Sequence, residues 1–580
     1  PVDIAASPEG TCLYVCAHTS NQIVWVSKER QAVIGAVDLP APPSGITVHP
    51  SGDLLFVTGD LPEGNVYAIS KKGAIEYEIS VGHSPLAPTL SPDARLLFVC
   101  NRFDNDVSII DLDARKELAR VAVAREPVGS AVTADGKKLF VINHLPVGAA
   151  DGDYIAAQVS VIDVAAKQVV NTIALPNGSS SLRGICISPD GKHVYVAHLL
   201  SRYQLPTTQL ERGWMNTNAL TVIDTATAER INTVLLDDVS RGAANPWGIT
   251  CTADGARICV AHAGTHEISV IDRAALHDKL TRVAAGESVS SVSSKPEDVP
   301  NDLSFLVGLR HRIKLDGNGP RGLAMMGNTA YAAQYFSDTL GVVDVAEEIA
   351  RPQEWSLGEA KEPCVVRKGE IFFNDADLCF QQWQSCASCH PDARTDGLNW
   401  DLLNDGIGNP KNTKNMLLAH QTPPAMGLGV RDRAEVAVRA GIKHIQFAVR
   451  PEEDAVAIDE YLKSLTPTPS PELVNGALSE KAKQGEKIFE SAGCAECHPS
   501  PLFTNLKSYD FDMGTYQDEG KAFDTPTLIE AWRTGPYLHD GRAATLRDVL
   551  TVHNANNKHG DTAGLSEGEL DALVAYVRSL

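Results

Sequence analysis

The chain has 580 residues, of which 43% are hydrophobic and 21% charged, a composition typical of folded proteins and not of disordered ones. Its length predicts two or three domains. A formal net charge of −22 argues against nucleic acid as a partner and favours a basic one, such as a cationic redox protein. The simpler alternative is that the acidity only keeps a secreted protein soluble. No apolar run approaches the ~20 residues of a membrane helix, and the opening PVDIAASPEG has no signal-peptide features.

One pattern repeats over residues 1–360: a Pro/Asp/Gly turn, an apolar strand, a variable loop and a second strand that often ends in Ile-Asp. The first copies are 42 residues apart, at Pro8, Pro50 and Pro92, and looser copies follow at 133–163, 188–224, 252–272 and 327–345. A period of about 40–45 residues with four short strands per unit is typical of a β-propeller. The repeat resembles the YVTN-type propeller family, and we expect seven blades.

Insertions interrupt the later repeats. The loops 145–158 and 199–217 and the connection 273–320 are expected to crowd one rim, where they would dock another domain or line a substrate funnel. Four histidines end second strands, and they allow two readings: a metal or extra haem site, or polar strand ends bonded to neighbouring loops. These are His18, His144, His198 and His262.

Two CxxCH motifs follow, Cys386–His390 and Cys494–His498, each after a Gly-Glu-x-x-Phe run that predicts a short helix. A zinc site needs two ligand pairs closer together, and a thioredoxin-like motif needs a βαβ context. Covalent haem explains every residue, because the thiols form thioethers and the histidine binds iron. The motifs therefore predict two c-type haems, held by Cys386, Cys389 and His390 and by Cys494, Cys497 and His498.

The proline-rich run TPTPSP (466–471) separates the two motifs and cannot lie inside a helix. We expect an all-β propeller at 1–362, a first cytochrome c-type haem domain at 363–465 and a second at 472–580, both mainly α. Because c-type haem is attached outside the cytoplasm, a periplasmic or extracellular location follows.

The stretch 526–553, with its TGPYLHDGRAATL core, resembles the bacterial di-haem cytochrome c peroxidase family, which includes MauG. The resemblance spans about 365–580. It implies that the first haem reacts with peroxide and that the second supplies its electrons. It also implies a calcium ion between the two domains, with ligands at Asn412, Thr534 and Pro536, the last two through their carbonyls.

A ligand for the other face of the second haem is suggested by helical spacing. Thr545 and Asp548 form a capping-box pattern, after which His553 falls on the same face as Leu546 and Val549. A histidine on such a stripe is often only a core residue. The resembled family has methionine or tyrosine at this position as the sixth iron ligand, so His553 would give a bis-histidine iron of lower potential.

The first haem departs from the resembled family. The family's inter-haem tryptophan falls on Gly427, its pocket glutamine on Ala437, its pocket glutamate on Phe447 and its detachable distal histidine on Asn404. These departures argue against ordinary peroxide chemistry, which needs an open iron and a group that moves a proton.

Other residues are candidates to supply what these positions lack. Glu435 and His444 are candidate acid–base residues, and His444 has the further alternatives of binding iron and closing the site or of being a plain surface residue. His420 is a weaker candidate. Trp400 and Trp532 are possible substitutes for the bridging tryptophan.

We therefore predict a secreted di-haem oxidoreductase that reacts with peroxide, or oxidises a small molecule or protein substrate, at its first haem. Its second haem exchanges electrons with a redox partner such as a small cytochrome or cupredoxin. The main alternative is a pure electron carrier whose propeller is a docking platform. A MauG-like oxidation of a partner protein, and chemistry in the propeller itself, are the remaining alternatives.

Overall fold

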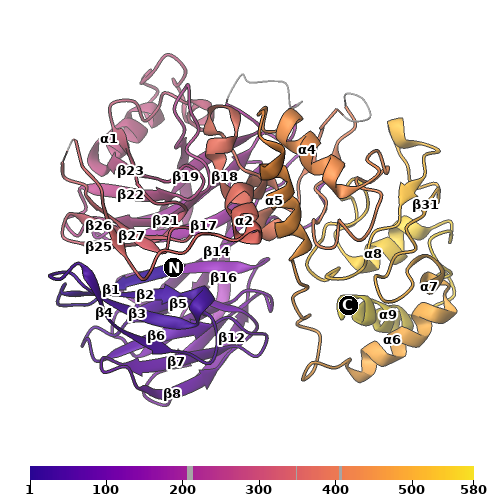
Figure 1. Ribbon diagram of the computed structural model, residues 1–580, viewed down its shortest axis with the longest axis horizontal. Helices are drawn as coiled ribbons and strands as arrows, with labels where there is room; N and C mark the ends of the chain where they lie inside the picture. The colour runs from indigo at the N-terminus through magenta and orange to yellow at the C-terminus, as the bar shows by residue number, and fades with distance from the viewer. Residues whose placement is uncertain (206–212, 348, 404–407) are drawn as a thin grey trace.

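The computed structural model describes residues 1–205, 213–347, 349–403 and 408–580. Its first part is a ring of seven four-stranded antiparallel sheets, and its second part is mainly helical (Figure 1). The predicted seven-bladed propeller followed by a mainly α part is thus confirmed. No helix in these ranges is long and apolar enough to cross a bilayer.

Each blade consists of four consecutive strands, and the order in every sheet follows the chain. The blades are β1–β4 (Asp3–Ala6, Cys12–Ala17, Gln22–Ser27, Ala32–Asp38), β5–β8 (Pro43–Val48, Leu54–Gly59, Asn65–Ser70, Ile75–Ser80), β9–β12 (Pro85–Leu90, Leu96–Asn101, Asp106–Asp111, Lys116–Ala122), β13–β16 (Pro127–Val132, Lys138–Asn143, Gln158–Asp163, Gln168–Ala174), β17–β20 (Ser179–Ile187, His193–Ser201, Asn216–Asp224, Glu229–Leu235), β21–β24 (Pro246–Cys251, Arg257–His262, Glu267–Asp272, Arg310–Lys314) and β25–β28 (Pro320–Met326, Thr329–Gln334, Thr339–Asp344, Gln353–Ser356).

The repeated turn between the first and second strands has a side-chain lock. Ser91 Oγ donates a 2.6 Å hydrogen bond to the carboxylate of Asp93, which also accepts from the backbone of Arg95. The same 2.6 Å bond recurs in three other blades, at Thr133–Asp135, Ser188–Asp190 and Thr252–Asp254. Short Ser/Thr and Asp side chains favour such turns because they bond to nearby backbone groups. The repeated sequence pattern therefore reflects the same hydrogen-bonded turn in these four blades.

The first strands of the blades contact one another around the propeller axis, so they form its inner wall. The ring closes by packing and not by strand exchange, since the first blade holds β1–β4 and the last β25–β28. Ile4 and Leu13 of the first blade share an apolar cluster with Tyr331 and Trp355 of the last.

The helical part forms two units. The first unit contains α2 (Val365–Asn374), α3 (Cys386–Cys389), α4 (Ala434–His444), α5 (Glu452–Lys463) and the β29–β30 pair (Asn399–Trp400, Lys411–Asn412). The second contains α6 (Glu480–Ser491), α7 (Cys494–Cys497), α8 (Leu546–Leu550), α9 (Glu567–Arg578) and the β31–β32 pair (Ser508–Tyr509, Phe523–Asp524). The propeller has one insertion helix, α1 (Arg273–Ala284), and 3-10 turns lie at η1 (His18–Ser20), η2 (Pro296–Asn301), η3 (Ala376–Leu378), η4 (Phe380–Gln382), η5 (Pro391–Ala393), η6 (Tyr516–Asp518) and η7 (Val552–Asn554).

The propeller insertions dock the helical part, as the sequence predicts. In the 145–158 loop, the Ala150 amide donates to the carbonyl of Gly541 at 2.8 Å. In the described part of the 199–217 loop, Asn216 Nδ2 lies 3.2 Å from Cys389 Sγ. Leu303 of the 273–320 connection packs against the same apolar cluster as Cys389.

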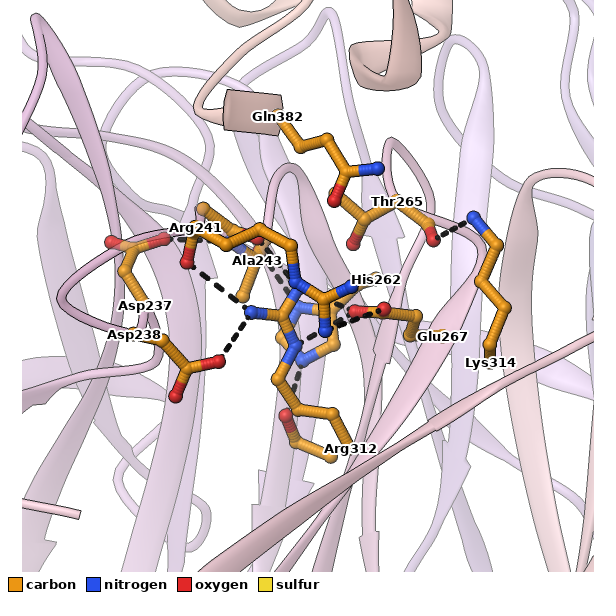
Figure 2. Close-up of polar contacts among 12 residues, drawn as sticks. Asp237, Asp238, Arg241, Ala243, His262, Thr265, Glu267, Arg312, Lys314 and Gln382 are labelled. Carbon is orange, nitrogen blue, oxygen red and sulfur yellow. Dashed lines mark hydrogen bonds and ion pairs between the residues drawn. The ribbon is translucent and has the colours of Figure 1, made fainter. Parts of the chain in front are cut away.

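The strand-end histidines bond to neighbouring groups, as the simpler of their two readings predicts. His262 Nδ1 donates to the carbonyl of Ala243 at 2.8 Å, and its Nε2 lies 2.7 Å from Ser269 Oγ. Figure 2 shows His262 beside a polar network in which Arg312 donates to Glu267 at 2.7 Å and to Asp238 at 2.9 Å. These bonds brace the loop between β20 and β21, which carries Asp238 and Ala243 and contacts the helical part.

The other strand-end histidines also have polar partners, although the Nε2 atom of His144 is buried without one. His198 bonds to Leu199 and Thr221, His144 to the carbonyl of Leu182, and His18 lies 3.5 Å from Asp60. Within the described ranges, none of the four belongs to a group with metal-ligand spacing.

Candidate haem sites

The two helical units share one packing device. In the first unit α2 packs against α5, and in the second α6 packs against α9. A Cβ on Gly369 would overlap the carbonyl of Ala457, and a Cβ on Gly485 would overlap that of Ala572. Glycine therefore lets each pair of helices touch backbone to backbone.

An aromatic pair follows one helical turn after each glycine. The ring centroids of Phe373 and Tyr461 lie 5.4 Å apart in the first unit, and those of Phe489 and Tyr576 lie 5.3 Å apart in the second. Both pairs are tilted or edge-on, which is the favourable arrangement for aromatic rings. The two units are thus built alike around the helices that flank each CxxCH.

Each CxxCH histidine is oriented by a backbone carbonyl. His390 Nδ1 lies 3.1 Å from the carbonyl of Arg394, and His498 Nδ1 lies 2.9 Å from that of Phe503. An imidazole that donates through Nδ1 presents the Nε2 lone pair, as an iron ligand must. Burial lowers the pKa of both rings, which favours this neutral form.

The cysteines of both motifs carry free thiols on the one-turn helices α3 and α7, immediately before the histidines. Thioether attachment needs thiols that no disulfide has consumed, and the four thiols meet this need. The residues present therefore fit covalent haem at both motifs.

A residue that the sequence did not single out, His559, faces His498. The two ring centroids lie 6.4 Å apart with their planes at 57°. Two imidazoles that share one metal ion at metal–nitrogen distances of about 2.0–2.1 Å have centroids roughly 6 Å apart. His559 Nδ1 is buried without a hydrogen-bond partner, and burial lowers its pKa to about 4.

The loop that carries His559 is fixed beside the second CxxCH. A Cβ on the next residue, Gly560, would lie 3.5 Å from Cys494 Sγ. Buried Asn554 donates to the carbonyls of both His559 and Gly560 and accepts from the His559 amide at 2.8 Å. No helical periodicity marks this loop, so the only signal in the sequence was a histidine a short distance after the resembled motif.

His553 lies outside a continuous helix. The capping box of Thr545 and Asp548 forms as expected, but α8 ends at Leu550 and His553 follows in the 3-10 turn η7. The apolar stripe therefore does not extend to His553, whose ring is half-buried. Its role as an iron ligand stays a prediction.

In the first unit, the apolar residue Ile445 lies in a place comparable to that of His559 in the second unit. Gln446 lies beside Cys386, lining the same small hollow, much as Gly560 lies beside Cys494. The residue before Gln446 is Ile445, which packs with Cys389 against a cluster of tryptophans. This cluster comprises Trp214, Trp383 and Trp400, with Ile155, Tyr203, Met215 and Leu398. Ile445 and His559 both lie within eight residues of the start of the last helix of their unit.

The two candidate acid–base residues do not come together. His444 is exposed at the end of α4, and Glu435 lies near its start, 3.9 Å from Lys463. At 1.5 Å per residue they are about 13 Å apart along the helix axis. By contrast His420 is buried, with Nε2 3.0 Å from Asp459 and Nδ1 without a partner.

The two candidate tryptophans, and the positions at which this chain differs from the resembled family, also lie in separate parts of the structure. Trp532 packs edge-on against Phe103 of the propeller at 5.2 Å, and Trp400 donates to Asp396 at 2.9 Å. A Cβ on Gly427 would lie 3.7 Å from Lys414 and 3.8 Å from His539. Asn404 lies outside the described residues.

Two of the expected calcium ligands, Asn412 and Pro536, lie close together although they come from different units. Asn412 is buried, and its backbone N–H donates to the carbonyl of His539 at 2.8 Å. A Cβ on Gly541 would lie 2.7 Å from Asn412 and 3.1 Å from Pro536, so both residues flank Gly541. Thr534 is in the same loop, two residues before Pro536.

No family model matches the chain. Hydrazine synthase subunit gamma from Kuenenia stuttgartiensis is 32% identical over 273 residues, which cover 37% of this chain and 77% of that protein. The chain belongs to the hydrazine synthase subunit gamma family. Hydrazine synthase subunit beta from the same organism is 28% identical over 217 residues, 37% of this chain and 52% of that protein. The chain thus spans about three quarters of one subunit and about half of the other.

Other proteins that are similar to this chain are haem enzymes. Methylamine utilization protein MauG from Methylorubrum extorquens is 25% identical over 289 residues, 38% of this chain and 78% of that protein, and cytochrome-c peroxidases are also similar. A solved chain of Kuenenia stuttgartiensis hydrazine synthase matches with a TM-score of 0.53 and 25% identity, over 59% of this chain and 95% of that one. The chain is accordingly a haem oxidoreductase.

In this family member the propeller contacts the first haem-binding segment through charge. Asp392, two residues after His390, accepts from Arg102 at 2.5 Å and from Arg183 at 3.2 Å, both on the propeller. Arg533 of the second unit donates to the same carboxylate at 3.0 Å. These arginines hold the pKa of Asp392 well below its usual range, although desolvation of the carboxylate opposes them. One carboxylate thereby ties all three parts of the chain together.

Proposed function

We propose that this chain is a di-haem c-type oxidoreductase in which His390 would hold the first haem and leave it accessible to a small oxidant, while His498 and His559 would hold the second haem, which would supply electron transfer. The observation that carries the proposal is the 6.4 Å separation of the His498 and His559 rings. Isoleucine in the comparable place of the first unit supports an open first site, because its side chain has no atom that binds iron.

The residues of each unit have distinct tasks in this proposal. A c-type haem supplies one-electron redox chemistry and, where an axial position is open, a place for peroxide or another small oxidant. His390 and His498 are held in the ligating tautomer by the Arg394 and Phe503 carbonyls. The tryptophan cluster beside Cys389 excludes water, which strengthens electrostatic interactions at the first site.

Acid–base assistance at the first site belongs to the same proposal, with His420 as one candidate. Its Nε2 lies 3.0 Å from a carboxylate oxygen of Asp459, and its Nδ1 is buried without a hydrogen-bond partner. Glu435 and His444 remain proposals with less support, because one pairs with Lys463 and the other is exposed.

We also propose calcium at Asn412 and the Thr534 and Pro536 carbonyls. Oxygen ligands from side-chain amides and carbonyls suit this ion, and the convergence of Asn412 and Pro536 on Gly541 supports the site. Calcium there would fix the contact between the two units. A redox partner such as a small cytochrome or cupredoxin, and a periplasmic or extracellular location, belong to the same proposal.

Electron paramagnetic resonance of the oxidised holoprotein tests the proposal. We expect one low-spin signal from the bis-histidine haem and one high-spin signal that changes when a small excess of peroxide is added. Two low-spin signals without a peroxide response would overturn the open first site and leave a pure electron carrier with the propeller as its docking platform.

A second candidate is a reaction of the hydrazine synthase kind. The match of one chain to both subunit beta and subunit gamma favours it. Incubation of the reduced holoprotein with small inorganic nitrogen compounds, followed by an assay for hydrazine, tests this candidate directly.

A further inference from the structure

A cavity of about 220 Å³ lies between the propeller mouth and the first haem-binding segment. Arg183, Trp247 and Arg321, from the inner strands β17, β21 and β25, line its propeller side. Ala387 and Ala393, which flank His390 in the sequence, line the opposite side. Since a water molecule takes up roughly 30 Å³ in the liquid, the space suits a small molecule.

Arg321 differs from the other cations of this cavity. Arg183 is paired with Asp392 at 3.2 Å, and the cavity's other carboxylate, Glu370, is paired with Arg367 at 2.7 Å. Arg321 forms no ion pair or hydrogen bond with a carboxylate among the residues that the structure describes, and its Nε is buried without a partner. Arg321 is half-buried, and a guanidinium that is partly withdrawn from water without a counter-charge is costly, so an anion would stabilise it.

Aromatic rings hold the Arg321 side chain in place. Its guanidinium lies 3.6 Å from the ring centroid of Tyr335 and 4.5 Å from that of Trp247. Arg183 lies over the same Trp247 ring at 4.2 Å. Cation–π contacts leave the N–H groups of a guanidinium available. The fork of Arg321 is therefore pre-organised without having its donors consumed.

A second unsatisfied polar group lines the cavity. Ser181 is only 6% exposed, and its hydroxyl has no hydrogen-bond partner. A buried hydroxyl without a partner costs free energy unless a ligand or water satisfies it. Ser181 and Arg321 thus offer hydrogen-bond donors to the same cavity.

The charges around the cavity also favour an anion, in a protein whose net charge is −22. Five arginines of the cavity and its neighbouring ion pairs face three carboxylates: Arg102, Arg183, Arg321, Arg367 and Arg533 against Glu126, Glu370 and Asp392. The region has an excess of positive charge, which draws small anions from solution.

We propose that this cavity binds a small monoanion with carboxylate-type or oxyanion oxygens, with Arg321 as the charged anchor and Ser181 as a hydrogen-bond donor. The aromatic walls admit a compact ligand and leave little room for a phosphorylated metabolite. The site goes beyond the proposed haem chemistry, because binding of the anion does not depend on which reaction the haem carries out.

Calorimetric titration of the oxidised holoprotein with sodium formate and with sodium acetate, at constant ionic strength set by sodium chloride, tests this inference. We expect saturable binding of one anion per chain, weakened at least tenfold in Arg321→Gln and weakened less in Ser181→Ala. Arg321→Lys keeps the charge without the planar fork and is expected to be intermediate.

Arg115→Gln is the matched control, because Arg115 also lies over a ring, 4.4 Å from the centroid of Tyr77, but is exposed and remote from the cavity. Unchanged melting temperatures would show that the variants are folded. Absence of saturable binding to the wild-type protein, or equal binding by Arg321→Gln and Arg115→Gln, would overturn the proposal. Either result would leave the spin-state test of the haems unaffected.

Discussion

Arg394 and Glu530 join the two helical units through a buried, two-pronged ion pair, with both hydrogen bonds 2.7 Å long. The carbonyl of the same Arg394 orients His390. His390, the proposed ligand of the first haem, is thus linked to the second unit through a single residue, Arg394. Glu530 also accepts from the amide of Thr468, so the proline-rich run between the units is fastened and not a loose hinge.

Removing one partner of this pair leaves an uncompensated buried charge. We expect Arg394→Met to lower the free energy of unfolding by about 3–5 kcal/mol, measured by denaturant titration. Lys483→Met serves as control, because its pair with Glu480 is exposed and contributes at most about 1 kcal/mol. Equal effects of the two substitutions would contradict the structural role of the Arg394–Glu530 pair.

His559 and His553 make opposite predictions for the second haem. With His559 as the ligand, His559→Ala converts the low-spin signal to high spin and raises the haem's reduction potential, since a bis-histidine ligand set keeps it low. His553→Ala then leaves both unchanged. Redox titration followed by paramagnetic resonance measures both quantities. The reverse pattern would restore His553 as the ligand.

A ligating side chain at Ile445 is expected to close the first haem. In Ile445→His the high-spin signal is replaced by a low-spin one, and the response to peroxide falls at least tenfold. Ile445→Val, which loses one buried methylene and costs about 0.5–1.5 kcal/mol, keeps the open site. Persistence of the high-spin signal in Ile445→His would place the open position elsewhere.

The close helix crossings require glycine. We expect Gly485→Ala to destabilise the second unit by about 1–3 kcal/mol or to prevent its folding, because the new Cβ overlaps the carbonyl of Ala572. Gly568→Ala is the matched control in α9, where a Cβ meets nothing within 4 Å and alanine favours the helix by about 0.5–1 kcal/mol. Thermal melts of both variants would show opposite shifts.

Asp396 gives a pH dependence of defined sign. Burial raises the pKa of its carboxyl to about 6, so the folded chain binds a proton that the unfolded chain releases above about pH 4. The contribution of Asp396 to stability is therefore largest at low pH and is lost as the pH rises from about 4 to about 6. In Asp396→Asn this loss disappears, and unfolding titrations at several pH values should show a flatter profile than the wild type.

Local chemistry explains which features could be predicted from the sequence. The propeller follows from turns such as Ser91–Asp93, whose bonds form within a few residues, and the proposed haem attachment follows from CxxCH. His559 escaped prediction because it lies in a loop without periodicity and meets His498 only in the folded unit. The role of Arg321 could not be predicted from the sequence, because Trp247 and Ser181, its neighbours in the cavity, come from other blades of the propeller.

His444 illustrates the limit of helical spacing. Helical spacing places His444 on the same face of α4 as Val436 and Ala440, but spacing alone does not say what that face contacts. The structure leaves His444 exposed and buries the next-but-one residue, Gln446, beside Cys386.

The contact of Asn216 with Cys389 has a consequence for how the protein behaves on dilution. Here the propeller and the haem-binding part belong to one chain, so their contact is intramolecular and its effective concentration is fixed by the linkage. The first site therefore stays covered however scarce the protein becomes, and its turnover per molecule is expected to be independent of protein concentration.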